Sequence, residues 1–159
     1  YRNIRWQGTS QGTHSDDLVT ASDLPFSSLL AYDTAHFPAE RRSFLYRWIN
    51  QQEGSALAKV SHDEEVLGYG VIRRCFEGYK IGPIFADDVR IADELFEGLT
   101  ATVPGETIFF DTPELNPDAV RMATRRGMTE VFGTARMYSG SSPVLPINEI
   151  FGVTSFELG

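Results

Sequence analysis

The segment 78–99 constrains the fold more than any other part of this sequence, because it reads as a strand that leads directly into a helix. Gly82-Pro83 lies in the middle of that strand, and a proline inside a strand requires a break in the ladder of hydrogen bonds. The helix is predicted over 89–99, where apolar residues recur at helical spacing after Asp87 and Asp88, two acidic residues that can cap it. A broken strand that leads into a helix N-terminus is a common arrangement for holding a phosphorylated ligand. Loops that hold a pyrophosphate normally contain glycines, however, and none lies at the start of this helix.

The rest of the hydrophobic pattern predicts a mixed α/β domain, because the spacing of apolar residues changes between strand and helix periods along the chain. Helices are expected at 22–32, 38–50, 89–99 and 116–127, and strands at 1–6, 17–20, 56–60, 66–74, 78–86, 107–111, 129–138 and 150–158. Strands 56–60, 66–74 and 78–86 are predicted to form an antiparallel set. The apolar strand 107–111 is predicted to lie parallel to 78–86 through a right-handed crossover.

Composition limits the partners that this chain can have. Its 159 residues carry a net charge of −8, so the basic surface that nucleic acid or an anionic membrane requires is not expected. The single cysteine, Cys75, cannot form an intramolecular disulfide, and the three histidines show no metal-ligand spacing. No apolar run is long enough to span a membrane, and the N-terminus does not read as a signal peptide. We therefore expect a cytoplasmic protein with no metal site.

The polar connector 7–17, rich in glycine, threonine, serine and glutamine, is the one segment that reads as a linker. Residues 1–16 are therefore expected to be a terminal strand and a linker, and 17–159 to form one domain with a single core. No internal repeat or change in composition suggests a further boundary.

The order of these elements and two motifs resemble the GNAT acetyltransferase fold. In that fold a mixed, largely antiparallel sheet flanked by helices splays open between its fourth and fifth strands to admit acetyl-CoA. Gly82-Pro83 falls where the family has a bulge in the fourth strand. The family's fourth-helix motif, Asn-x-x-Ala followed by Gly and an apolar residue, is matched by Asn116, Ala119, Gly127 and Met128. The resemblance covers residues 17–159.

More narrowly, several runs resemble the C-terminal half of two-domain GNAT proteins. These runs are 32–33 with 37–41, 68–73, 78–83 and 151–154. In such proteins an N-terminal GNAT half comes first, and residues 1–6 are similar to the last strand of that half. The resemblance therefore implies an acetyl-CoA-dependent N-acetyltransferase that acts on a small-molecule or peptide amine. This chain would be its C-terminal half and would have the N-terminal half as a partner.

Two departures from the family pattern leave other functions open. The family's fourth strand leads into a loop of the form Gln/Arg-x-x-Gly-x-Gly/Ala, whose amides hold the pyrophosphate, whereas Asp88-Val89-Arg90 stands here and only Ala92 matches. The tyrosine that often protonates the departing thiolate corresponds to Ala123. One alternative is a non-catalytic GNAT-like module that recognises a ligand or completes an active site built elsewhere. Another is a domain that only supports dimerisation.

The resemblance implies that Ile84, Phe85 and Ala86 bind the pantetheine arm of acetyl-CoA, because a splayed strand leaves its backbone groups unpaired. An amide near Phe85 would then hold the oxyanion of the reaction. We therefore expect a groove with free backbone groups at these three residues, although an ordinary core strand is the alternative. Asn116 is a further candidate contact to the same arm, and its position as a helix N-cap is the other explanation for it.

The remaining candidates are charged residues that are predicted to lie beside this groove. Asp111 ends its strand, where a carboxylate can act as general base for the attacking amine or can simply form a turn. Arg73, Arg74 and Lys80 come from adjacent strands and could hold an acceptor that carries a carboxylate or a phosphate. The alternative is that these cations form internal ion pairs with carboxylates such as that of Asp111.

Overall fold

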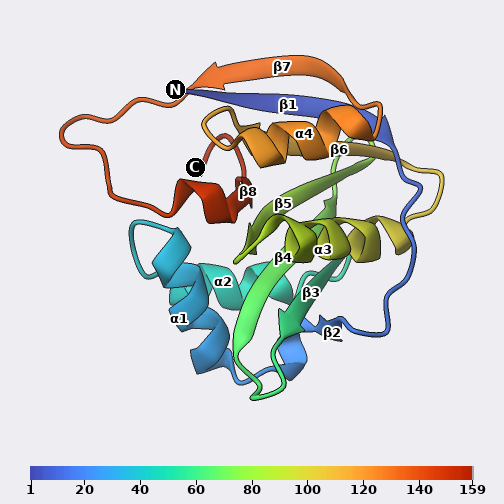
Figure 1. Cartoon of the computed structure of the whole chain (residues 1–159), viewed down its shortest axis with the longest axis vertical. Helices are drawn as coiled ribbons and strands as arrows, with labels where there is room; N and C mark the ends of the chain where they lie inside the picture. Colours follow the sequence, from blue (N-terminus) through green and yellow to red (C-terminus); the bar gives the residue numbers. More distant parts are fainter. Residues whose placement is uncertain (159) are drawn as a thin grey trace.

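Strands and helices alternate along most of residues 1–158, the part of the chain that this computed structural model describes (Figure 1). The strands are β1 (Arg2–Thr9), β2 (Val19–Thr20), β3 (Gly54–Val60), β4 (Val66–Arg74), β5 (Tyr79–Ala86), β6 (Thr107–Pro113), β7 (Thr129–Ala135) and β8 (Ile150–Gly152). The helices are α1 (Phe26–His36), α2 (Arg42–Ile49), α3 (Val89–Ala101) and α4 (Pro117–Arg125), with the short 3₁₀ turns η1 (Ala21–Asp23) and η2 (Ile147–Glu149). Within the described residues the strands form one open sheet in the order β2-β3-β4-β5-β6-β1-β7, and β8 pairs with β5 outside that order.

The sheet is mixed and mostly antiparallel, as predicted. β3, β4 and β5 pair antiparallel, and β6 runs parallel to β5 after the crossover through α3. The break at Gly82-Pro83 is confirmed, because the pairing of β4 with β5 shifts register between Gly70 and Ile72 at this point. The acidic cap of α3 is confirmed too, since Asp88 accepts a hydrogen bond from the Ile91 amide.

Two predicted elements are shorter in the structure. α2 begins at Arg42 rather than near Pro38, because the backbone of Arg41 is not helical. The last strand ends at Gly152 rather than continuing to residue 158, because the next amide donates its hydrogen bond to β6 instead of β5. Short strands and helix starts depend on such tertiary bonds, which a local pattern does not contain.

Two hydrophobic clusters cover the two faces of the sheet. Helices α3 and α4 pack on one face, and α1 and α2 pack on the other (Figure 1). Successive residues of a strand face opposite sides, so β5 contributes Ile84 to the cluster under α3 and α4, and Phe85 to the cluster under α1 and α2. β5 is therefore buried on both faces, which fits the continuous apolar character of its second half.

β1 lies inside the sheet between β6 and β7, and is paired antiparallel with both. The terminal strand that the sequence separated from residues 17–159 is thus built into the same sheet. β7 is the outermost strand at this end and exposes Val131 and Phe132. The origin of β1 in a preceding half of a longer protein stays a prediction.

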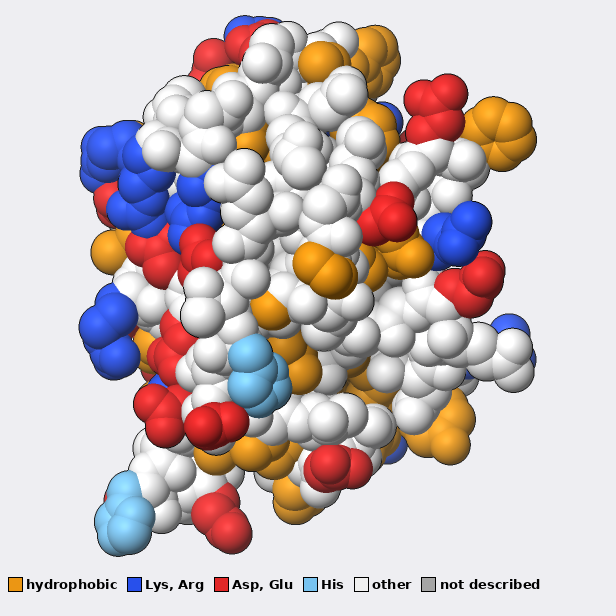
Figure 2. Space-filling view, turned by 90° about the vertical axis from the view of Figure 1, so that its right-hand side faces the viewer, with side chains coloured by type: hydrophobic (Ala, Val, Ile, Leu, Met, Phe, Trp, Pro, Cys, Tyr) orange, Lys and Arg blue, Asp and Glu red, His pale blue; other side chains and the backbone are white. Residues whose placement is uncertain are grey.

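The face of the molecule shown in Figure 2 carries basic and acidic side chains next to one another. Apolar side chains are scattered between them rather than gathered into one broad patch (Figure 2). None of the helices within residues 1–158 combines the length and the apolar character that crossing a bilayer requires.

Candidate functional site

β5 and β6 separate after Gly82-Pro83, as predicted, and β8 lies in the space between them, which we call the wedge. β5 and β6 pair over residues 79–81. Beyond the break, Ile84 and Phe85 pair with β8 instead. Ala86 pairs with β4 on the other side. The divergence of the two strands is therefore confirmed, but the expectation of free backbone groups at Ile84 and Phe85 is wrong, because the chain's own C-terminal strand occupies them.

The side chains of β8 also fill the volume of the wedge. Phe151 is only 1% exposed and belongs to the hydrophobic cluster under α3 and α4. Gly152 lies against β6 so closely that a Cβ atom at this position would be 2.8 Å from a ring carbon of Phe110. An extended ligand in the wedge would therefore compete with β8 for both the backbone groups and the space.

Asn116 fastens β8 to the start of α4. Its Oδ1 accepts hydrogen bonds from the amides of Asp118 and Ala119, which makes it the N-cap of the helix. Its Nδ2 donates to the carbonyl oxygens of Asn148, at 3.2 Å, and of Ile150, at 3.0 Å. Both polar atoms of the Asn116 side chain are thus hydrogen-bonded to backbone groups of this chain. The cap motif alone does not predict that this residue lies next to β8.

A buried ion pair holds the residues that follow β8. Arg41 donates two hydrogen bonds to Asp33, at 2.8 and 2.7 Å, and a third to the hydroxyl of Thr154 at 2.9 Å. Burial is the largest single influence on the pKa of Arg41 and lowers it, but the hydrogen bonds to and charge of Asp33, together with Tyr69, outweigh burial and raise that pKa on balance. Tyr69 donates a further bond to Asp33 at 2.5 Å, and burial raises the pKa of its phenol well above the ordinary value. The loop before α2 and the segment after β8 are therefore locked together.

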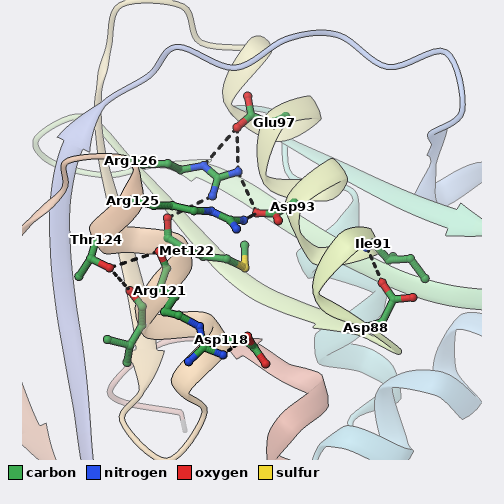
Figure 3. A network of polar contacts seen from close by, with 11 residues as sticks. Asp88, Ile91, Asp93, Glu97, Asp118, Arg121, Met122, Thr124, Arg125 and Arg126 are labelled. Carbon is green, nitrogen blue, oxygen red and sulfur yellow. Dashed lines mark hydrogen bonds and ion pairs between the residues drawn. The ribbon is translucent and has the colours of Figure 1, made fainter.

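The N-terminus of α3, where the family pattern places a pyrophosphate, is capped by the chain's own carboxylates. Asp88 Oδ1 accepts from the Ile91 amide at 2.8 Å (Figure 3). The neighbouring Asp87 accepts from the Tyr32 hydroxyl at 2.7 Å. Burial and this bond to Asp87 both raise the pKa of Tyr32. Two carboxylates thus lie where a phosphate would need amide donors and positive charge.

The arginines of α4 are also engaged by carboxylates of this chain. Arg125 and Arg126 reach across to Asp93 on α3, and Arg126 is bonded to Glu97 at 2.8 Å (Figure 3). Arg121 pairs with Asp118 within its own helix (Figure 3). These contacts join α3 to α4 and neutralise the cations that face the start of α3.

Asp111 and Lys80 form an ion pair at the centre of the sheet, together with Arg5 of β1. The Asp111 carboxylate is fully buried and lies 2.6 Å from Lys80 Nζ. Arg5 donates two hydrogen bonds of 2.8 Å to the same carboxylate, and these bonds raise the pKa of Arg5. The Phe156 ring covers both cations, at 4.5 Å from the Arg5 guanidinium and 5.3 Å from Lys80 Nζ. The alternative of an internal ion pair is therefore the one found for Lys80.

Arg5 is the member of this cluster that sequence reasoning missed. Strand alternation in residues 1–6 places Arg5 on the face opposite to Ile4 and Trp6, and this signal could have identified it as a cation facing β6. Whether Asp111 also serves as a general base stays a prediction. The geometry requires an amine to displace Arg5 or Lys80 before it could reach the carboxylate.

Arg73 and Arg74 lie on β4, and neither forms an ion pair with a carboxylate of residues 1–158. The Arg73 guanidinium lies 5.1 Å from the centre of the Trp48 ring and donates to the Cys75 sulfur at 3.3 Å. Its Nε is buried without a hydrogen-bond partner among the described residues. Arg74 is exposed. Substrate binding by these two arginines stays a prediction.

Replacing Arg73 by glutamine is expected to lower the free energy of unfolding by about 1 kcal/mol, because the variant loses the cation over Trp48. The same change at exposed Arg74 is expected to alter it by less than about 0.5 kcal/mol. Urea unfolding of the two variants measures the difference. Unchanged stability at Arg73 together with weaker acceptor binding in the longer protein would assign this arginine to the substrate instead.

This architecture is shared with proteins of known sequence and structure. A family model described as an acetyltransferase (GNAT) domain matches residues 29–152. A curated relative, the holothin acyltransferase of Pseudoalteromonas sp. (strain SANK 73390), is 29% identical over 142 residues, which are 89% of this chain and 47% of the relative.

Solved structures share the fold at low sequence identity. A structure from Pyrococcus horikoshii, described as a candidate acetyltransferase, has a TM-score of 0.79 and 21% identity, and the match covers 100% of this chain and 52% of that one. A candidate GNAT-family acetyltransferase from Novosphingobium aromaticivorans has a TM-score of 0.62 and 16% identity, with 83% of this chain and 61% of that one covered. The chain thus spans about half the length of the curated relative and of the Pyrococcus structure.

Proposed function

Because this chain belongs to the GNAT acetyltransferase family, we propose that the protein containing it is an N-acetyltransferase that transfers an acetyl group from acetyl-CoA to the amine of a small molecule or peptide. The match of the family model over residues 29–152 is the observation that carries this proposal. In such a transfer the amine nitrogen bonds to the thioester carbonyl carbon, the carbon–sulfur bond breaks, and the amine gives up a proton as the thiolate leaves.

The proposal includes the position of this chain as the C-terminal half of a longer protein, with an N-terminal GNAT half as its partner. The length of the curated relative supports it, since the match accounts for 47% of that protein.

Acetyl-CoA does not fit the wedge of this chain. β8 occupies the backbone of Ile84 and Phe85, to which the pantetheine arm was assigned, and Asn116 is bonded to β8. Asp88 caps the helix that would receive the pyrophosphate. Ala123, at the place of the proton-donating tyrosine, is fully buried. We therefore assign the acyl donor to a part of the longer protein outside this chain.

Titration calorimetry of this chain with acetyl-CoA is expected to show no binding tighter than about 1 mM, which corresponds to roughly 4 kcal/mol. Occupation of the wedge by β8 and the charge of Asp87 and Asp88 both oppose the ligand. The longer protein is the positive control, and it is expected to bind acetyl-CoA and to acetylate an amine. A dissociation constant of about 10 μM or lower for this chain alone, roughly 7 kcal/mol, would contradict the assignment of the donor to another part.

Two results for the longer protein would decide the function itself. Acetylated amine formed at the expense of acetyl-CoA supports the transferase. No product with any amine, together with tight binding of another ligand, would favour the module that only recognises a ligand.

A further inference from the structure

An open cavity of about 320 Å³ lies apart from the wedge, between the start of β1, the end of β7 and residues 156–158. Figure 1 shows the marked N-terminus next to the arrowhead of β7. The volume is in the range of small-molecule sites, roughly 300–1,000 Å³. The polar side chains of its wall are those of Asn3, Thr134, Arg136, Tyr138 and Glu157.

The carboxamide of Asn3 is the most informative of these groups. Asn3 is 2% exposed, and its Oδ1 is buried without a hydrogen-bond partner among residues 1–158. Buried polar atoms in folded proteins are almost always bonded, because an unpaired acceptor costs free energy. A group that donates hydrogen bonds from within the cavity would satisfy this amide.

Arg136 gives the cavity a positive charge that no carboxylate of residues 1–158 neutralises. Its Nε donates to the Tyr138 hydroxyl at 3.2 Å. Burial raises the pKa of Tyr138, but hydrogen bonds with Tyr1, Arg136 and Ser142 and the charge of Arg136 together outweigh it and lower that pKa. Burial and the bond to Tyr138 raise the pKa of Tyr1 to about 12. The remaining guanidinium nitrogens of Arg136 make no hydrogen bond to the described residues, so they can bind an anion in pairs.

Glu157 adds a negative charge to the wall of the cavity, and it forms no ion pair with a cation of residues 1–158. Hydrogen bonds from Ser155 and from its own backbone lower the pKa of Glu157, and Lys80 and Arg5 act in the same direction. The neighbouring Phe156 supplies an apolar wall, and its ring is held in place over Arg5 and Lys80. One cavity thus contains an unpaired cation, an unpaired carboxylate and an unpaired buried amide.

We propose that this cavity binds a free α-amino acid. The ammonium group would lie between Asn3 and Glu157, the carboxylate would lie against Arg136, and the side chain would pack on Phe156. This assignment rests on the proposed function in one respect, namely that the bound amine is the acceptor of the acetyl group. It would give this half of the protein the task of recognising the acceptor.

Binding is tested first on this chain without any acyl donor. Each of the twenty common L-amino acids is titrated in a calorimeter, and at least one is expected to bind with a dissociation constant of about 1 mM or tighter. Its N-acetyl derivative and its amide are each expected to bind about tenfold more weakly, because one loses the ammonium charge and the other the carboxylate. Absence of saturable binding by any of the twenty overturns the proposal.

Single substitutions then test whether the amino acid binds in this cavity. Arg136→Gln and Glu157→Gln are each expected to weaken binding of that amino acid about tenfold. Arg47→Gln, a change on the exposed face of α2, is the matched control and is expected to leave binding unchanged. Far-ultraviolet circular dichroism checks that every variant is folded. Equal affinity in Arg136→Gln and the unchanged chain overturns the site.

The acceptor role is separated from binding by an assay of the longer protein with acetyl-CoA and the amino acid that binds. N-acetylated product with a KM that rises in Arg136→Gln supports both the site and the proposed function. Binding to the chain with no acetylated product overturns the proposed function but leaves the cavity as an amino-acid site. Product formation that is insensitive to Arg136→Gln overturns the cavity alone.

Discussion

Asp111→Asn is expected to lower the free energy of unfolding by about 3–5 kcal/mol, because it removes the negative member of a buried ion pair. The carboxylate has no exposure and is bonded to Lys80 and Arg5. Asparagine keeps the shape but removes the charge that both cations contact, and the Lys80 side chain is almost completely buried. Urea unfolding followed by circular dichroism measures the loss, through a lower midpoint with an unchanged slope.

Two further variants identify the cause of that loss. Glu40→Gln breaks an ion pair between side chains that are more than half exposed, so it is expected to cost less than about 0.5 kcal/mol. Asp111→Asn combined with Lys80→Met removes one of the two stranded charges, and it is expected to recover part of the stability of Asp111→Asn. A loss below about 1 kcal/mol for Asp111→Asn, with turnover of the longer protein reduced about a hundredfold, would instead assign Asp111 to proton transfer.

Phe151→Ala is expected to cost about 3–5 kcal/mol, because it empties the part of the wedge that β8 fills. Phe151 is 1% exposed and lies within the cluster under α3 and α4. The matched control is Phe76→Ala. Phe76 is fully exposed, so its loss is expected to change the free energy of unfolding by less than about 0.5 kcal/mol.

The Phe151 variant also tests whether β8 is what keeps acetyl-CoA out of the wedge. A cost near that of the Phe76 control would mean that β8 contributes little to the fold and can leave. Calorimetry of Phe151→Ala with acetyl-CoA then gives a direct answer. Binding by this variant but not by the unchanged chain would show that β8 is the principal barrier, and binding by neither would point to the carboxylates at the start of α3 as well.

The sequence predicted the backbone of the sheet well where the signal was local. A proline within a strand has no amide to donate, so Gly82-Pro83 marked the break in β5. The apolar run at 107–111 indicated a buried strand, and its position after a helix indicated a parallel one. These inferences held because each depends on residues that are neighbours in the chain.

The closure of the wedge could not be predicted in the same way. The pattern at 150–158 indicated a strand, but nothing in it says which strand is its partner. That choice depends on Asn116, whose side chain bonds to the carbonyl of Ile150, and on the bond from the Val153 amide to β6. Such contacts join residues far apart in the chain, and a periodic pattern has no information on them.

The ion pairs of Asp111 with Lys80 and Arg5 could not be predicted from a local pattern either. Lys80 and Asp111 were both singled out from the sequence, but as a substrate contact and a base rather than as partners. Their ion pair needs the parallel register of β5 and β6 and the arrival of Arg5 from β1. A carboxylate that looks available for chemistry in a sequence is often bonded to a cation that folding brings to it.

The place of β1 has a consequence for the order in which the molecule can be assembled. Its two neighbours in the described sheet, β6 and β7, are both translated long after it, so its pairing with them has to wait until most of this chain has been made. The pairing of Asn3 with Pro113 and with Thr134 closes very long loops, and contacts of this kind form slowly. Until β6 and β7 have been made, the two edges of β1 that they cover in the folded sheet can accept other strands.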